Sequence, residues 1–290
     1  MKQSVFMTGR RRTLVAVLVM SLIVVGSVVV AMVTRNDGFR AAPAFVEGAI
    51  LKIPGGSANR ISVVGDDIEV VVGTSPAVTS ASIVLGSAGF YRDFRAKTGT
   101  YGLCLDSAPA VQAGVKRLTV VVPENGTLTL TLVGKARLVL EQAQLKELRL
   151  AGVSSALELD ASGSGSIIDL VQIENVTGGF STTRLGNLNM ADLVISNITG
   201  RYDLDFSGSL DRHCDVSLHT AVGNGTVRIP RKPGARISVG RVLGNVLSSG
   251  FVTEGRTSFL NASAAGGSDR QLVMRIDSAI GQIQLVEVQQ

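Results

Sequence analysis

The chain has 290 residues, of which 45% are hydrophobic and only 4% aromatic. Its formal net charge of +5 comes mostly from the basic residues of the first twelve positions, so the remainder is nearly neutral. A nearly neutral remainder with no Trp and three Tyr lacks the basic surface and the stacking rings that nucleic-acid binding uses, and we expect no nucleic-acid partner.

The first predicted element is a transmembrane signal-anchor helix at Thr13–Thr34, a run without a charged residue. At about 1.5 Å per residue it would span roughly the hydrocarbon thickness of a bilayer. The basic tail, residues 1–12, predicts a cytoplasmic N-terminus and an extracytoplasmic C-terminal domain in a single-pass membrane protein. One alternative is a signal peptide cleaved after Ala31, although its apolar core would be shorter than this run, and another is a buried helix of a soluble protein.

Residues 35–47 resemble a short stalk, and residues 48–290 are predicted to form one extracytoplasmic β-repeat domain. Its first part contains alternating apolar runs such as Ile61–Val63 and Ile68–Val72. Glycine is abundant, with 33 residues, as tight turns between short strands require.

From Leu118 onward, short alternating apolar runs recur about every ten residues. The runs begin at Leu118, Leu128, Leu138, Leu148, Leu157 and Ile168. Alternation predicts strands with one apolar and one wet face, and it assigns Leu130, Leu148 and Leu159 to the interior. We therefore predict an all-β fold, a β-solenoid or β-roll of short repeated strands, preceded by the N-terminal transmembrane helix.

The two cysteines, Cys104 and Cys214, would lie in an oxidising compartment if the predicted topology holds. A disulfide between them is one hypothesis. Two small buried thiols are the alternative.

Five Asn-x-Ser/Thr sequences make possible glycosylation sites. They begin at Asn125, Asn175, Asn197, Asn224 and Asn261. Asparagine also tolerates the left-handed conformation of tight turns, so these residues serve equally well as turn formers.

Candidate catalytic groups are few. Asp211, His213, Cys214, Asp215 and His219 lie close in sequence, but neighbours in a strand point to opposite faces, so His213 cannot easily activate Cys214. A metal site through Cys214 and His219 lacks further ligands of suitable spacing. We expect no catalytic residue, no cofactor and no metal.

A pair of carboxylates, Asp203 and Asp205, alternates with apolar residues and could supply the acid and base of a carbohydrate-active β-helix enzyme. The wet face of a strand explains the same pattern. The hypothesis that the chain is such an enzyme is therefore kept only as an alternative.

The C-terminal part resembles the bacterial putative-adhesin domains. The similar segments are Gly223–Pro230, Gly234–Gly240, Gly244–Gly250 and Arg275–Leu285, and the resemblance covers about residues 115–288. It implies a right-handed β-solenoid or roll in a membrane-anchored envelope protein, related to the domains that end cell-wall-stress membrane proteins. It brings no catalytic residue, and the single span departs from the several spans of the stress regulators.

These patterns together predict a membrane-anchored β-solenoid that is not an enzyme. It would act as an adhesion, binding or envelope-stress module, with the membrane at residues 13–34 and an envelope polymer or a protein as partners. A purely structural envelope protein is the remaining alternative.

Overall fold

The computed structural model describes residues 40–41, 50–52, 59–64, 68–77, 82–85, 94–99, 102–107, 116–163, 165–267 and 270–289. All of them belong to one compact unit, Arg40–Gln290. No helix within these residues is long and apolar enough to cross a membrane, and the predicted span Thr13–Thr34 lies outside them. The prediction of a single-pass membrane protein thus finds no supporting helix in the part of the chain that the structure describes.

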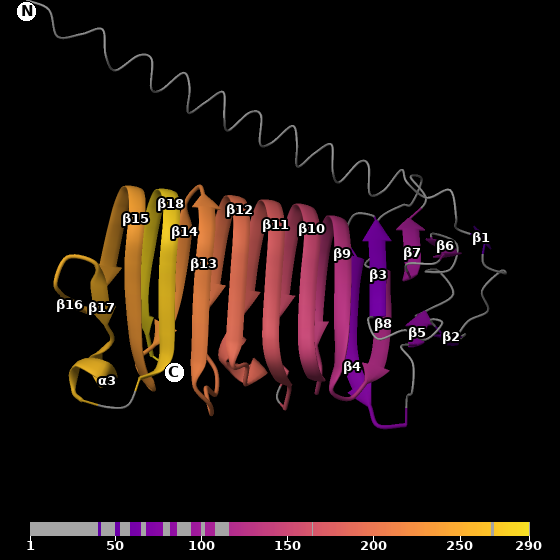
Figure 1. The fold of residues 1–290 in the computed structure, drawn as a ribbon, viewed down its shortest axis with the longest axis horizontal. Coiled ribbons are helices and arrows are strands. Elements are labelled where there is room, and N and C mark those ends of the chain that lie inside the picture. Colours follow the sequence, from indigo (N-terminus) through magenta and orange to yellow (C-terminus); the bar gives the residue numbers. More distant parts are fainter. Residues whose placement is uncertain are drawn as a thin grey trace, which may run out of the picture. The chain divides into compact units, whose positions relative to one another are not determined.

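The described residues form an all-β unit with two very short helical turns (Figure 1). The strands of the first part are β1 (Arg40–Ala41), β2 (Ile50–Lys52), β3 (Asn59–Val64), β4 (Ile68–Ser75), β5 (Ser82–Leu85), β6 (Phe94–Gly99), β7 (Gly102–Ser107) and β8 (Lys116–Pro123). The later strands are β9 (Gly126–Leu140), β10 (Gln144–Asp160), β11 (Ile167–Thr183), β12 (Asp192–Asp205), β13 (Cys214–Val222), β14 (Gly225–Pro230), β15 (Gly234–Ser249), β16 (Val252–Glu254), β17 (Ser258–Leu260) and β18 (Arg270–Val288). The turns are η1 (Leu185–Leu188) and α3 (Ala262–Ala265).

The central strands are parallel and follow the chain order. β9 pairs with β10, β10 with β11, β11 with β12, and β12 with β13, all in parallel. From β10 to β13, residues 22 or 23 positions apart in sequence thereby become neighbours, as the side-chain contacts Asn197–Asn175 and Arg149–Gln172 show, and between β9 and β10 the separation is 19 to 21. Two of the predicted ten-residue runs therefore lie in one strand: Leu128 and Leu138 both belong to β9.

The order of the strands breaks down at both ends of the sheet. β12 pairs with β13 and with β14, and β18 pairs in parallel with the same two strands. β15 then pairs with β18, so the last strand of the chain is inserted between β13/β14 and β15. At the other end, β3 and β4 both pair with β9, while β7 and β8 extend the sheet beyond them.

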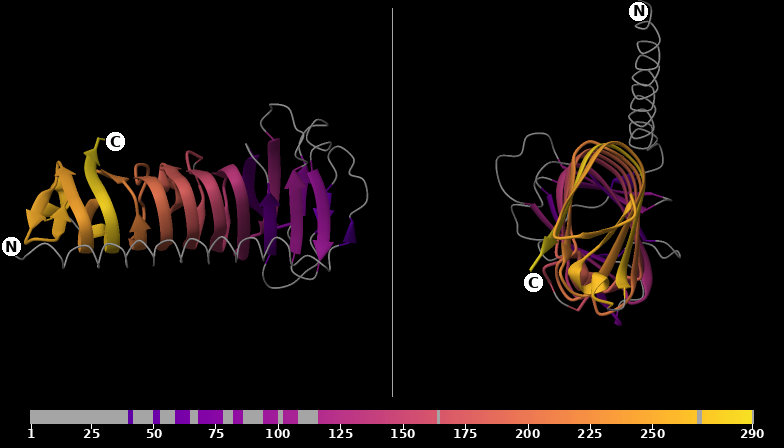
Figure 2. Two further views of the ribbon diagram at one scale, coloured as in Figure 1. Left: turned by 90° about the horizontal axis from the view of Figure 1, so that it is seen from above. Right: turned by 90° about the vertical axis from the view of Figure 1, so that its left-hand side faces the viewer.

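The predicted fold class is wrong beyond its all-β character. The sheet closes on itself as a parallel barrel of six strands with further strands outside it, in place of a solenoid or roll of short strands in sequence order. Seen along the long axis of the unit, the strands curve around a common interior (Figure 2). The sequence pattern misled because alternation continues through the bends inside each long strand, so that half a strand resembles a complete one.

The interior is filled by the inward residues of all these strands. Leu130, Leu148 and Leu159 are each 0% exposed, which confirms their assignment to the core. Because neighbouring strands are parallel and in register, aliphatic residues of the same row lie above one another, as Leu148 does on Leu128 and Val171.

One bend of the long strands is built from stacked glycines. Gly178, Gly200, Gly223, Gly281 and Gly244 all have positive φ, and a Cβ added at Gly200 would lie 1.8 Å from the carbonyl oxygen of Gly178. The same close approach recurs between Gly223 and Gly200 and between Gly244 and Gly281. We call these five residues the glycine ladder. Only glycine permits both this backbone conformation and the approach of one strand to the next.

Candidate functional site

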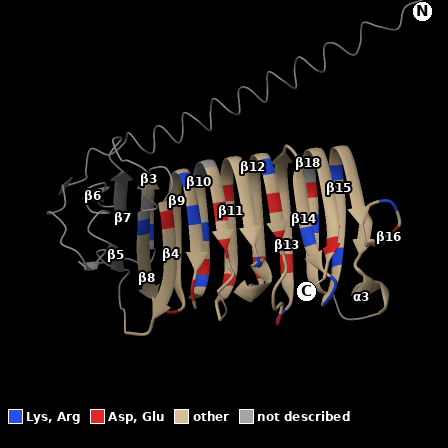
Figure 3. Cartoon of the chain, turned by 180° about the vertical axis from the view of Figure 1, so that it is seen from behind, with Lys and Arg blue, Asp and Glu red and all other residues tan. Residues whose placement is uncertain are grey.

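The outward side chains of the parallel strands form a row of charges. Glu69, Arg137, Glu158, Ser181 and Asp203 are successive partners in the register of β4, β9, β10, β11 and β12. We call these five residues the charged row. Figure 3 shows basic and acidic residues on successive strands of this sheet. Its first three members, Glu69, Arg137 and Glu158, place opposite charges on adjacent strands, which favours this register.

Ion pairs connect the charged row to its neighbours. Arg137 contacts Glu69 at 3.7 Å, Glu158 at 3.6 Å and Asp160 at 2.5 Å. Asp203 pairs with Arg228 of β14. These contacts hold the side chains in fixed positions on the sheet, although each exposed pair adds little stability.

Asp160 is the carboxylate of this region that is most withdrawn from water. Burial opposes its ionisation, but hydrogen bonds from Ser162 and Arg137 outweigh burial and hold the pKa of Asp160 below its ordinary value. Asp160 is therefore an ionised anchor for Arg137.

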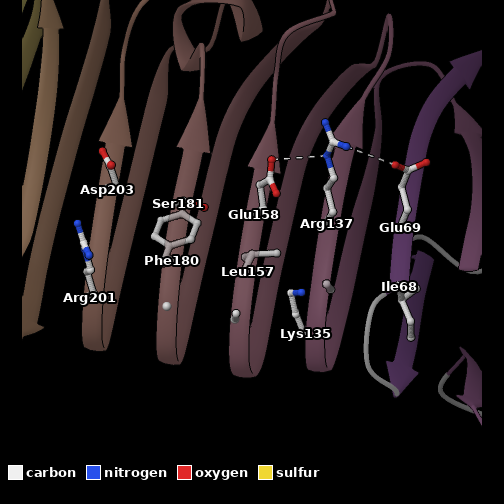
Figure 4. Close-up of a pocket in the computed structure, with 13 residues that line it drawn as sticks. Ile68, Glu69, Lys135, Arg137, Leu157, Glu158, Phe180, Ser181, Arg201 and Asp203 are labelled. Atoms are coloured by element: carbon white, nitrogen blue, oxygen red, sulfur yellow. Dashed lines mark ion pairs between the residues drawn. The ribbon is translucent and has the colours of Figure 1, made fainter. Parts of the chain in front are cut away.

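A groove of about 500 Å³ lies beside the charged row, across β4, β9, β10, β11 and β12 (Figure 4). Ala156, Gly179 and Ser181 line its middle and send no long side chain outward. A Cβ added at Gly179 would lie 3.9 Å from the Cβ of Ala156, which is ordinary contact. The groove is thus open because two adjacent strands carry small residues at the same level.

Long charged residues stand at both sides of this opening. Lys135 precedes Ala156 in the register, and Arg201 follows Gly179. Three strand spacings of about 4.8 Å each separate the backbones of these two residues, or roughly 14 Å in total. The groove therefore has a basic side chain at each end and the charged row along one side.

Two candidate catalytic groups are occupied by structural contacts. Asp203 pairs with Arg228, and Asp205 accepts hydrogen bonds from the backbone N–H of Ser207 and of Arg184. Both carboxylates thus have partners within the fold. The structure brings Asp203 to the groove, whereas Asp205 is not among the residues that line it.

The residues around Cys214 do not assemble into a thiol site. Cys214 is 0% exposed, and burial raises its pKa to about 12, which suppresses the reactive thiolate. His213 is exposed and contacts Asp215 at 3.3 Å, while His219 contacts Asp277 of β18 at 2.7 Å. The histidines therefore serve two separate surface pairs.

The proposed Cys104–Cys214 disulfide is absent from this structure, because Cys214 is a free cysteine. Cys104 lies in β7, and the strands β3, β9, β10, β11 and β12 stand between β7 and β13 in the order of pairing. The side chain of Cys104 is outside the described part of the chain. The alternative of a small buried thiol describes Cys214.

The five sequon asparagines fall into two groups. Asn125, Asn175 and Asn197 have φ between 57° and 60°, so they occupy the left-handed turn conformation, and Asn224 is exposed. Asn261 is fully buried and caps α3: its Oδ1 accepts from the N–H of Ala264, and its Nδ2 donates to the carbonyl of Pro230. A glycan on Asn261 is incompatible with this packing, whereas glycosylation at the other four stays a prediction.

No group of three or more His, Cys, Asp or Glu residues in the described ranges is arranged to hold a metal ion. The groove could not be predicted from local sequence patterns. Its signal was present in the spacing of 21 to 23 residues, which places Arg137, Glu158, Ser181 and Asp203 in one row once the strands are known to be parallel.

The fold and this groove define a class: an all-β protein with a rigid parallel sheet and an outward-facing, charge-lined groove. No family model matches the chain, and no curated protein matches it. Among solved structures it is similar to a "putative cell adhesion protein" from Clostridium sporogenes, with 17% identity, a TM-score of 0.39, and coverage of 86% of this chain and 100% of the other. It is also similar to a "putative adhesin" from Bacteroides fragilis, with 8% identity, a TM-score of 0.35, and coverage of 83% and 100%.

Proposed function

We propose that the chain is a recognition module of the adhesion type, which binds a segment of an extended polar polymer in the groove and does not transform it. The observation that carries this proposal is the groove itself, with small residues in its middle and charges fixed around it. Its volume is within the range of about 300–1,000 Å³ that ligand sites commonly have.

The surroundings of the groove favour recognition over chemistry. Arg137 is held by three carboxylates and Asp203 by Arg228, so these groups present a fixed pattern of charge to a partner. A partner that reaches across β10 and β11 would meet Arg201 and Lys135 at the two ends, which suits a chain bearing acidic groups. The stiff parallel sheet below reduces the loss of conformational freedom on binding.

The test is a binding screen of the full chain against immobilised acidic polysaccharides and acidic peptides. Ala156→Phe fills the groove from an outward position and is expected to abolish binding without affecting folding. Ser217→Phe adds the same ring at an outward position of β13, away from the groove, and should leave binding unchanged. Equal binding by both folded variants would contradict the proposal.

The same samples distinguish the enzyme alternative. Each polymer that binds is incubated with the wild-type chain and with Asp203→Asn, whose carboxylate lines the groove, and its length is followed over time. Cleavage that Asp203→Asn slows by about a hundredfold or more would establish catalysis and reject a pure recognition module.

A further inference from the structure

The end of the sheet at β15 has an open edge. One edge of β15 pairs with β18 along Gly234–Ser249. Within the described residues, its other edge is bonded at residues 235–239: β17 lies antiparallel to residues 236–238, the N–H of Val239 donates to the carbonyl of Thr257, and the carbonyl of Ala235 accepts from the N–H of Asn261. From Arg241 to Ser249, backbone donors and acceptors of that second edge therefore have no strand partner in the described part of the chain (Figure 1).

This edge lacks the features that usually prevent strands from adding to a sheet. After Arg241, the segment Val242–Ser249 contains no charged residue and no proline. Leu243 is 63% and Leu247 50% exposed, values unusual for leucine in this unit, whose interior leucines are almost fully buried. An open and apolar edge of this kind favours the addition of another strand.

At β15 the apolar interior of the sheet is only partly covered. Val242 and Val246 of β15 are partly buried and pack against the core. They stand two positions before and two positions after Gly244, the terminal member of the glycine ladder, where the strand bends. The segment is thus nearly symmetric about Gly244 in the residues that face the core.

We propose that two copies of this chain associate end to end, by antiparallel pairing of their Arg241–Leu247 edges about a two-fold axis at Gly244. In this register Val242 of one copy faces Val246 of the other, so each copy covers the open end of the other's core. Arg241 faces Leu247, whose apolar side chain can pack on the arginine stem, and no like charges meet. The pairing is isologous and closes as a dimer.

The occupant is a second copy because the edge complements itself. The two valines that flank Gly244 match each other, and the bend at Gly244 coincides with the same bend in the partner only when the axis passes through this residue. The paired residues 241–247 lie beyond the segment 235–239 that is already bonded within the chain, so the register leaves the β15–β17 pairing in place.

Cysteine crosslinking of the full chain tests the register in a Cys104→Ser background, since Cys214 is buried. Val242→Cys and Val246→Cys are prepared as separate variants and mixed under mild oxidation. Directly opposed residues of an antiparallel pair have Cα atoms about 4.5–5.5 Å apart, which suits a disulfide. We expect a disulfide-linked dimer from the mixture and little from either variant alone.

The matched control is a mixture of Leu243→Cys and Leu247→Cys, whose thiols are more exposed but are not opposed in this register. Absence of a crosslink in the valine mixture would overturn the proposal, as would equal crosslinking in the control mixture. Light scattering of Leu243→Lys/Leu247→Lys supplies a second measurement, because two added charges on each edge should shift dimer to monomer. Ile167→Lys, at an exposed position of β11, should leave the mass unchanged.

Discussion

The parallel strands β9 to β12 and the strands β13 to β18 build the same kind of sheet from different chain paths. In the first region each strand pairs with the next one in sequence. In the second, β18 enters between β13/β14 and β15. Both regions nevertheless share the same inward rows and one glycine ladder. The comparison shows that the match between the inward rows of neighbouring strands determines where a strand lies in the sheet. The order of the strands in the sequence matters less.

The largest expected effect comes from substitutions that disrupt the core in both regions. Leu148→Asp in β10 and Ile276→Asp in β18 each bury an unpaired carboxylate and should lower the free energy of unfolding by about 4 kcal/mol or prevent folding. Lys146→Ser and Arg275→Ser, at outward positions of the same strands, should cost less than about 0.5 kcal/mol. Urea unfolding measures all four, and tolerance of Ile276→Asp would show that β18 is not part of the interior.

The glycine ladder gives the next largest effect. Gly200→Ala and Gly281→Ala would bring a Cβ within 1.8 Å and 2.0 Å of the carbonyl oxygen on the adjacent strand. Each should cost about 2–4 kcal/mol by thermal unfolding, since backbone must move and φ is positive. Gly255→Ala has positive φ but open space around it, so a cost of about 1 kcal/mol is expected. Equal costs at all three would reject close strand approach as the cause.

A smaller and pH-dependent effect sharpens the comparison at the charged row, which begins at Glu69 of β4 and continues along strands that follow sequence order. Asp160→Asn should lower stability by about 1 kcal/mol at neutral pH. Because the folded-state pKa of Asp160 lies below its ordinary value of 3.8, its contribution is complete above that value and is lost as pH falls through the folded-state pKa. The stability difference between wild type and variant should therefore vanish in strong acid, and a constant difference would contradict this assignment.

The smallest effect concerns Tyr202, whose hydroxyl has no hydrogen-bond partner in the described structure. Burial raises its pKa to about 12. Tyr202→Phe removes an unsatisfied polar group and should leave the free energy of unfolding within about 1 kcal/mol of wild type, or raise it. A loss larger than this would reveal a partner for the hydroxyl.

Much of the local structure could be predicted from the sequence. Alternation identified the strands and the inward leucines, and asparagine was recognised as a turn former at Asn125, Asn175 and Asn197. These properties depend on neighbouring residues alone. The buried capping role of Asn261 depends on the carbonyls of distant residues, so no local pattern reveals it.

The length of the strands and their order could not be predicted in the same way. A ten-residue period is compatible with separate short strands or with two halves of one bent strand, and only the glycine ladder distinguishes the two. The insertion of β18 depends on matching Leu272, Met274 and Ile276 to rows formed by β13 and β15. The groove was missed for the same reason, since Ala156 and Gly179 become neighbours only in the parallel register.

The position of β18 is tested most directly by a pair of engineered disulfides. Thr226 of β14 is in register with Gln284 of β18, which is in register with Leu247 of β15. Thr226→Cys/Gln284→Cys should form a bond within one chain under mild oxidation, whereas Thr226→Cys/Leu247→Cys should not, because two strand spacings of about 4.8 Å exceed the reach of a disulfide. A bond in the second pair and none in the first would place β15 directly beside β14 and contradict the insertion of β18.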